Sequence, residues 1–340
     1  MAIILDAGAF FEKSHQGYLE THFFKALAKA FPEQQFVITA SSNTAAEMPE
    51  NVMQSNFPEQ KGLFRQKKLD KWLTAMNAQT FISFCKVLKT NYPLHQILII
   101  YDEAGIANTK NIEAANAIAL TSSGLQHLFT KKYPAFSKKS FLLEGIINEP
   151  IITESAIKSQ FTAEKEYFII ADFDLNQDQL VTVLKGFSAF KRMLLSSWKL
   201  MIIMRSVKFS KQQAEQLLSN YKYREDVVVT DEEQLGDKMA EAYALITVNS
   251  EAGFPVPAVE AFRVKTPVLA LTNSALNNIF GDAIAYIDQN SAEAIGEMLM
   301  TLYKEETLRR SLKQKMTEVS EIPNLQSAVS KLKIFLEQSK

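Results

Sequence analysis

Apolar residues in the first part of the chain gather in short runs of strand length, separated by longer segments with helical apolar spacing. A strand that is buried on both faces gives a continuous apolar run, whereas a covering helix is apolar on one side only. The runs predict strands at 2–7, 35–40, 80–85, 96–102, 117–123 and 140–146, and helices over 19–31, 62–76 and 124–133. The polar, proline-containing stretch 41–61 is predicted to be a loop.

A polar stretch at 148–164 interrupts this alternation, and the same pattern then starts again. The second part predicts strands at 167–173, 199–204, 226–230, 244–249, 267–271 and 283–288, with an irregular stretch before the last of them. Helical spacing predicts helices over 179–194, 211–221, 231–242, 292–303, 306–319 and 325–338.

Strand–helix alternation of this kind predicts parallel sheets with helices on both faces. Because 340 residues exceed one ordinary domain, we expect two Rossmann-like, doubly wound α/β domains that face each other across a cleft. The predicted domains are 1–147 and 165–320, and the predicted linker is 148–164. Ligands of open α/β sheets bind beyond the carboxyl ends of the strands, so the predicted site lies between the domains.

Composition restricts the partners and the compartment. Hydrophobic residues make up 47% of the chain and the net charge is −1, which does not favour nucleic acid as a partner. The single cysteine, Cys85, lies in the apolar run TFISFC, which predicts a small core residue in a reducing compartment. No apolar stretch is long enough to span a bilayer, so we expect a cytoplasmic protein without a transmembrane segment.

Two basic runs, at 65–71 and 131–139, leave a peripheral membrane contact open. They fit either solvated helix faces or a surface that meets anionic lipid headgroups. The chain contains no H-E-x-x-H pattern, no cluster of cysteines and no glycine-rich phosphate-binding pattern. We therefore expect neither a metal site nor a bound cofactor.

The stretch SEAGFPVPAVEAFRVKTPV, at 250–268, carries the strongest chemical signal. It predicts a strand end, a turn that contains Gly253, and a helix that begins near Pro257. A helix start presents backbone N–H groups, which attract phosphate. Glu260, one turn into this helix, could accept hydrogen bonds from two adjacent hydroxyls such as those of a ribose. The alternative is a solvated first-turn acid stabilised by the helix dipole.

This stretch, together with GDAIAYID at 281–288, resembles the signature of retaining glycosyltransferases of the GT-B fold, of the group-1 or family-4 type. The segments 167–192 and 231–250 are also similar to the family's donor-binding domain, and the first domain resembles it more loosely. The resemblance implies that Glu260 holds the donor ribose, and that Gly253, Phe254 and Pro257 form the donor-binding turn. It also implies that the last segment, 321–340, crosses back onto the first domain as a helix.

Several positions depart from the family pattern. The family's first motif glutamate falls on Ala252, and Glu251, a further donor-binding candidate, is one residue out of register. Pro255 replaces a glycine of the turn and cannot donate an N–H. The stretch ADFDLNQDQ, at 171–179, holds acids where the family has the basic pair that neutralises the diphosphate. Arg205, at the end of a predicted strand, is the nearest replacement; the alternative is an ordinary exposed residue.

The acceptor side offers two further candidates. Asp102 ends a predicted strand, where it could orient an acceptor hydroxyl or only cap the following turn. His15 and Gly17 fall where the family has a glycine loop, which implies that they face the acceptor side of the cleft.

The resemblance thus implies metal-independent transfer of a sugar, with retention, from a nucleotide-sugar donor to a hydroxyl acceptor. A glycan or a lipid-linked molecule could serve as the acceptor. The alternative is a pseudoenzyme, a non-catalytic GT-B-like partner or scaffold with weak or no nucleotide binding and a protein as its partner. Missing phosphate-binding cations favour the alternative, whereas the retained Glu260 and turn favour the enzyme.

Overall fold

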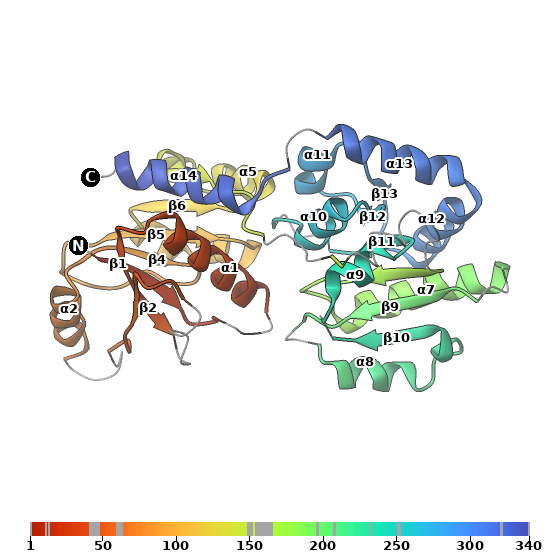
Figure 1. The fold of residues 1–340 in the computed structure, drawn as a ribbon, viewed down its shortest axis with the longest axis horizontal. Coiled ribbons are helices and arrows are strands. Elements are labelled where there is room, and N and C mark those ends of the chain that lie inside the picture. Colours follow the sequence, from red (N-terminus) through yellow and green to blue (C-terminus); the bar gives the residue numbers. More distant parts are fainter. Residues whose placement is uncertain are drawn as a thin grey trace.

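The structure, a computed structural model, describes residues 2–10, 12, 14–40, 48–58, 64–147, 152–153, 166–194, 197–206, 209–231, 233–249, 253–319 and 322–338. Two α/β domains lie side by side along the long axis of the molecule (Figure 1). The predicted class, two Rossmann-like domains, is therefore confirmed. The predicted linker lies outside the described residues apart from 152 and 153, so its boundaries stay a prediction.

The first domain contains a seven-stranded parallel sheet with the strand order β3-β2-β1-β4-β5-β6-β7. Its strands are β1 (Ala2–Ala7), β2 (Gln35–Ala40), β3 (Val52–Gln54), β4 (Ala78–Ser83), β5 (His95–Ile100), β6 (Ala117–Leu120) and β7 (Ser140–Leu142). Its helices are α1 (His15–Ala30), α2 (Arg65–Ala75), α3 (Glu103–Ala107), α4 (Thr109–Ala114), α5 (Ser123–Lys132) and the 3-10 helix η2 (Pro134–Lys139).

The second domain contains a six-stranded parallel sheet with the strand order β10-β9-β8-β11-β12-β13. Its strands are β8 (Tyr167–Ile170), β9 (Lys199–Ile203), β10 (Val227–Thr230), β11 (Ala244–Thr247), β12 (Val268–Leu271) and β13 (Ala285–Ile287). Its helices are α7 (Gln177–Leu194), α8 (Lys211–Leu218), η3 (Arg224–Asp226), α9 (Leu235–Ala240), α10 (Val256–Arg263), α11 (Ser274–Phe280), α12 (Ala292–Lys304) and α13 (Glu306–Glu318).

Apolar clusters fill both faces of each sheet, as expected for strands with continuous apolar runs. The last helix, α14 (Leu325–Gln338), lies against the first domain beside α1 (Figure 1). Its buried residues Ala328, Val329, Leu332 and Leu336 share a cluster with those of α1 and β1. The chain therefore ends on the domain in which it begins.

Several local predictions are wrong. Cys85, expected in the core, lies beyond the end of β4 and is exposed. Helix α1 begins at His15 and not near residue 19, because the Ser14 hydroxyl accepts a hydrogen bond from the Gly17 N–H at 2.9 Å and caps the helix. The predicted loop 41–61 contains strand β3, in which only Val52 is buried. The stretch predicted to be irregular holds α11, which the side chain of Asn273 caps.

Candidate functional site

A pocket lies where the two domains meet, at the carboxyl ends of β8, β11 and β12. The first domain contributes His15 from α1 and Tyr101 from the end of β5. The second domain contributes Asp172, Phe173, Asp174, Thr247, Asn249, Gly253, Phe254, Pro255, Val256, Pro257, Asn273 and Leu276. This position agrees with the site expected from the sequence.

The turn at Gly253 touches the other domain directly. A Cβ atom on this residue would lie 2.8 Å from the Tyr101 carbonyl oxygen, which is too close for any side chain. The absence of a side chain at Gly253 therefore lets the first domain close against the turn. Phe254 and Pro257 line the pocket and are buried at the start of α10, whereas Glu251 lies outside the described residues.

The start of α10 has few N–H groups left for a phosphate. The N–H of Val256 donates to the Phe254 carbonyl, and the N–H of Val259 donates to the Pro255 carbonyl. Pro257, at the second helical position, has no N–H. Of the first four residues of the helix, Ala258 is therefore the one whose backbone N–H could bind a phosphate oxygen.

Glu260 forms a buried ion pair with Arg205. The two guanidinium nitrogens Nη1 and Nη2 donate to Oε2 and Oε1 of the carboxylate at 2.5 and 3.1 Å. The side chains of Arg205 and Glu260 are 0% and 5% exposed. The alternatives of a solvated acid and an ordinary exposed arginine are therefore both wrong. Such forked pairs are the strongest hydrogen-bonded contacts between charged side chains.

Aromatic rings enclose this pair. The Phe173 ring centroid lies 3.7 Å from the Arg205 guanidinium carbon, and the Tyr18 ring centroid lies 5.3 Å from it. The Tyr18 hydroxyl also donates to Glu260 Oε1 at 3.4 Å. Because Tyr18 belongs to α1 of the first domain, the pair connects the two domains. Cation–π contacts of this kind are strongest where water is excluded.

His15 lines the pocket beside Phe173. Its ring stacks on Phe173 at 5.0 Å and meets the edge of Tyr101 at 5.2 Å. Its Nδ1 lies 3.9 Å from Asp174, and its buried Nε2 has no hydrogen-bond partner among the described residues. Burial and the nearby charge of Arg205 lower the pKa of His15 to about 3. The imidazole is therefore neutral near pH 7.

The stretch after β8 carries carboxylates and no cation. Asp172 is buried and accepts hydrogen bonds from the Thr247 hydroxyl at 2.6 Å and the Val248 N–H at 3.0 Å. These bonds hold the end of β8 against the end of β11. Burial raises the pKa of Asp172 to about 6. Asp174 faces His15 in the pocket, so this stretch supplies no positive charge to a diphosphate.

Two predicted acceptor-side features have local structural roles. Asp102 caps α3 by accepting from the Gly105 N–H at 2.8 Å, and it does not line the pocket. Gly17 lies in the first turn of α1, so the expected loop at His15 and Gly17 is wrong. A Cβ atom on Gly17 would lie 2.4 and 2.5 Å from the carbonyl oxygens of Glu12 and Ala9, so the turn before α1 requires glycine there.

Sequence reasoning missed three aromatic residues of the site, Tyr18, Tyr101 and Phe173. Tyr18 and Phe173 lie 155 positions apart in the numbered sequence and meet only in the folded chain, at 5.3 Å between ring centroids. The one available signal was that Tyr101 and Phe173 follow strands whose carboxyl ends face the cleft.

The described residues contain no group of three or more His, Cys, Asp or Glu side chains placed to hold a metal ion. Among the helices in the described part of the chain, none has both the length and the apolar character that a bilayer crossing requires.

Two facing parallel-sheet domains with a pocket between them define the GT-B class of fold, and solved structures share it over the full chain. A glycosyltransferase from Rickettsia africae ESF-5 superimposes with a TM-score of 0.70 at 11% identity, over 100% of this chain and 98% of that chain. WaaG, a glycosyltransferase involved in lipopolysaccharide biosynthesis, gives 0.72 at 14% identity, over 97% and 98%. Anabaena Alr3699/HepE in complex with UDP and glucose gives 0.73 at 10% identity, over 99% and 100%.

A family model matches the second domain. Residues 153–319 match the model of the family described as glycosyl transferases group 1. No curated protein matches the chain by sequence. The second domain is thus a group 1 glycosyltransferase domain, and the predicted enzyme class, a glycosyltransferase, is confirmed.

Proposed function

We propose that the protein transfers a sugar from a nucleotide-sugar donor to a hydroxyl acceptor, with retention at the anomeric carbon and without an obligatory metal ion. The observation that carries the proposal is the position of the pocket, which the group 1 domain builds at its strand ends and the first domain closes. The Anabaena relative of similar fold, solved with UDP and glucose, is consistent with a nucleotide sugar as the donor.

In this proposal the donor lies against the turn at Gly253, with its diphosphate at the start of α10 and its ribose at Glu260. A ribose offers two hydroxyl groups as hydrogen-bond donors. Arg205 donates the same number of hydrogen bonds to the Glu260 carboxylate in this structure. We therefore propose a partner exchange. The ribose takes over the Glu260 oxygens, and Arg205 turns toward the diphosphate, where the stretch after β8 supplies no cation.

The exchange also explains how Arg205 would speed the reaction. Negative charge grows on the diphosphate as the bond to the anomeric carbon breaks, and a positioned cation stabilises that charge. In the unliganded protein, the ion pair with Glu260 keeps the guanidinium from being a buried, uncompensated charge. The same arginine thus serves the fold before donor binding and the reaction after it.

On the acceptor side, we propose that His15 positions the attacking hydroxyl. The residue lines the pocket, its buried Nε2 has no partner among the described residues, and Asp174 lies on the Nδ1 side of the ring. With its pKa lowered to about 3, the imidazole is too weak a base to remove a proton from a hydroxyl near pH 7. It is suited instead to hold a hydroxyl by a hydrogen bond. In this proposal Asp102 supports the site only as the cap of α3.

The non-catalytic alternative has one structural observation on its side. Glu260 is already paired with Arg205, and acids line the pocket where a diphosphate would need cations. The comparisons do not favour this alternative. The two functions differ in one testable respect, because a scaffold releases no nucleoside diphosphate from any donor.

The test is release of nucleoside diphosphate from UDP-sugars and GDP-sugars by the full chain, with and without EDTA. We expect release from at least one donor, unchanged by EDTA, and a transferred or hydrolysed sugar that keeps the donor's anomeric configuration by NMR. His15→Ala should lower turnover more than it lowers donor affinity. Release that stops in EDTA would contradict metal independence, and a product of inverted configuration would contradict retention. No release from any donor would favour the scaffold.

A further inference from the structure

A second pocket lies on the first domain, away from the residues that form the donor pocket. It is bounded by the first half of α2 and by the segments that follow β3 and β4. Its lining residues are Phe57, Arg65, Gln66, Leu69, Lys86, Val87, Leu88 and Lys89. Among the described residues, the lining therefore combines apolar side chains with three cations and contains no acid.

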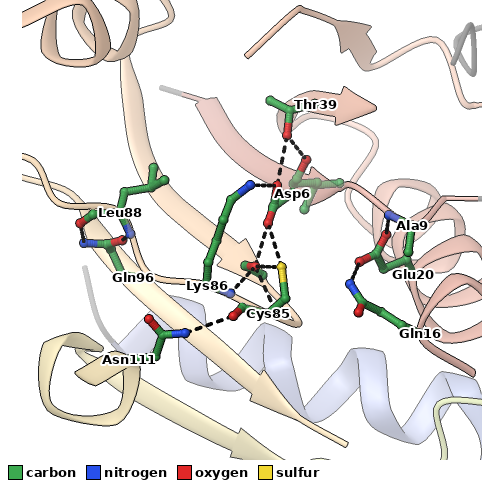
Figure 2. Close-up of polar contacts among 12 residues, drawn as sticks. Asp6, Ala9, Gln16, Glu20, Thr39, Cys85, Lys86, Leu88, Gln96 and Asn111 are labelled. Atoms are coloured by element: carbon green, nitrogen blue, oxygen red, sulfur yellow. Dashed lines mark hydrogen bonds and ion pairs between the residues drawn. The ribbon is translucent and has the colours of Figure 1, made fainter. Parts of the chain in front are cut away.

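The pocket adjoins the point where the strand order of the first sheet reverses. β2 and β3 lie on one side of β1, and β4 to β7 lie on the other. The crevice beyond the carboxyl ends of two such strands is where open α/β sheets bind ligands. Asp6, the next-to-last residue of β1, lies there and accepts from the Ser83 hydroxyl of β4 at 2.7 Å and from Lys86 Nζ at 2.9 Å (Figure 2).

The segment that carries the two lysines is fixed at several points. The Ser83 hydroxyl accepts the N–H groups of Cys85 and Lys86, both at 3.1 Å. The Gln96 side chain bonds both the N–H and the carbonyl of Leu88, at 2.7 and 3.0 Å (Figure 2). Lys86 is further placed by the Phe57 ring, whose centroid is 4.8 Å from its Nζ. A binding site whose protein side chains are already held in place loses less conformational entropy when its ligand binds.

The described residues of the lining give the pocket a positive charge balance. Asp6 offsets the charge of Lys86, which leaves the exposed Arg65 and Lys89 on the rim. The nearby Asp70 of α2 accepts a hydrogen bond from the Thr90 hydroxyl and is not part of the lining. An arginine and a lysine across an apolar floor fit an organic phosphate, whose oxygens take the charged hydrogen bonds.

We propose that this pocket, lined by Arg65, Lys86 and Lys89, binds a phosphate group carried by the acceptor. This inference rests on the proposed function, since it assigns a chemical class to the acceptor of that reaction. Two sources share this chemistry: a soluble phosphorylated glycan or stem, and the phosphate of a lipid headgroup. Asp6 is a positioning residue in this account, because it acts through Lys86.

The experiment titrates the full chain with hexyl phosphate by calorimetry, in wild type and in three variants. Arg65→Met and Lys89→Met should each weaken binding by about tenfold, the effect of losing one charged hydrogen bond. Lys71→Met, an exposed lysine of α2 outside the pocket, is the matched control and should change little. A parallel arm measures cosedimentation with phosphatidylglycerol vesicles and with neutral phosphatidylcholine vesicles.

Binding of hexyl phosphate that depends on Arg65 and Lys89 supports a soluble organic phosphate. Binding to the anionic vesicles alone, with the same dependence, supports a lipid headgroup. The inference is overturned if wild type binds neither probe, or if Lys71→Met weakens binding as much as the pocket variants do. Release of nucleoside diphosphate from donor alone is measured in the same variants. If that release is intact while neither probe binds, this inference fails and the proposed function stands.

Discussion

At the scale of single residues, the pair of Arg205 and Glu260 decides how the donor pocket works. A charge in a water-excluded site is stable only with a well-placed partner, and here each side chain is that partner for the other. Sequence alone predicts neither burial nor pairing, because the two residues are 55 positions apart on different elements. It does single out both residues, since Glu260 matches a family motif and Arg205 directly follows a predicted strand whose carboxyl end faces the cleft.

The pair should be strongly coupled in stability. Glu260→Gln or Arg205→Met leaves one buried charge without its partner, so each should lower the free energy of unfolding by about 3–5 kcal/mol. The double variant, Arg205→Met with Glu260→Gln, removes both charges and should lose clearly less than the sum of the two single losses. Denaturant unfolding of the four proteins measures this cycle. Additive losses would show that the two charges do not stabilise one another.

Glu20 provides a pH-dependent prediction. Its side chain is buried on α1 and accepts from the Ala9 N–H at 2.9 Å and from Gln16 at 2.6 Å (Figure 2). Burial raises its pKa from 4.5 to about 7, so between these values the folded state holds a proton that the unfolded state has lost. This carboxyl therefore makes the protein less stable as pH rises from about 4.5 to about 7.

Glu20→Gln should remove this loss, which amounts to at most about 3 kcal/mol. His15 acts in the opposite direction, because its pKa is lowered to about 3 and its unfolded form is protonated below 6.5. The measurement is therefore the difference in unfolding free energy between Glu20→Gln and wild type, followed across this pH range. We expect the variant to gain stability relative to wild type as pH rises. A difference that does not vary with pH would contradict the assignment.

At the scale of elements, the strands are the part that sequence predicts best. Most of them lie in the sheet interior, so a continuous apolar run marks them. The short edge strand β3 buries only Val52, so no apolar run predicts it. Helix starts are harder to predict, because they depend on single capping side chains and not on apolar periodicity. Ser14 and Asn273 each begin a helix in a stretch whose composition is polar.

The start of α1 is the element on which the site depends most, since it carries His15 and Tyr18 to the domain junction. Gly17→Ala would place a Cβ atom against two carbonyl oxygens of the preceding turn, so this turn and the helix start must move apart. We expect a loss of about 1–3 kcal/mol of stability, as for overpacked sites. Gly8→Ala is the control, because a Cβ atom there meets nothing within 4 Å. Equal stabilities of the two variants would show that α1 tolerates the shift.

At the scale of the whole molecule, several described contacts connect the two domains. Gly253 meets the Tyr101 carbonyl, Tyr18 meets Glu260, and α14 returns the end of the chain to the first domain. Strand–helix alternation predicts the two sheets, and the family resemblance adds the returning helix. The contacts across the cleft could not be predicted, because they depend on how two separately folded surfaces fit together.

The central claim is that the pocket between the domains binds a nucleotide-sugar donor with Glu260 at its ribose. Calorimetric titration of the full chain with UDP, GDP and their sugars tests it most directly, in wild type, Glu260→Gln and the exposed control Glu297→Gln. We predict saturable binding of at least one nucleotide, weakened by about 1–3 kcal/mol in Glu260→Gln and unchanged in Glu297→Gln. Circular dichroism confirms that the variants are folded. Absence of binding by wild type, or equal affinity in folded Glu260→Gln, would contradict the account.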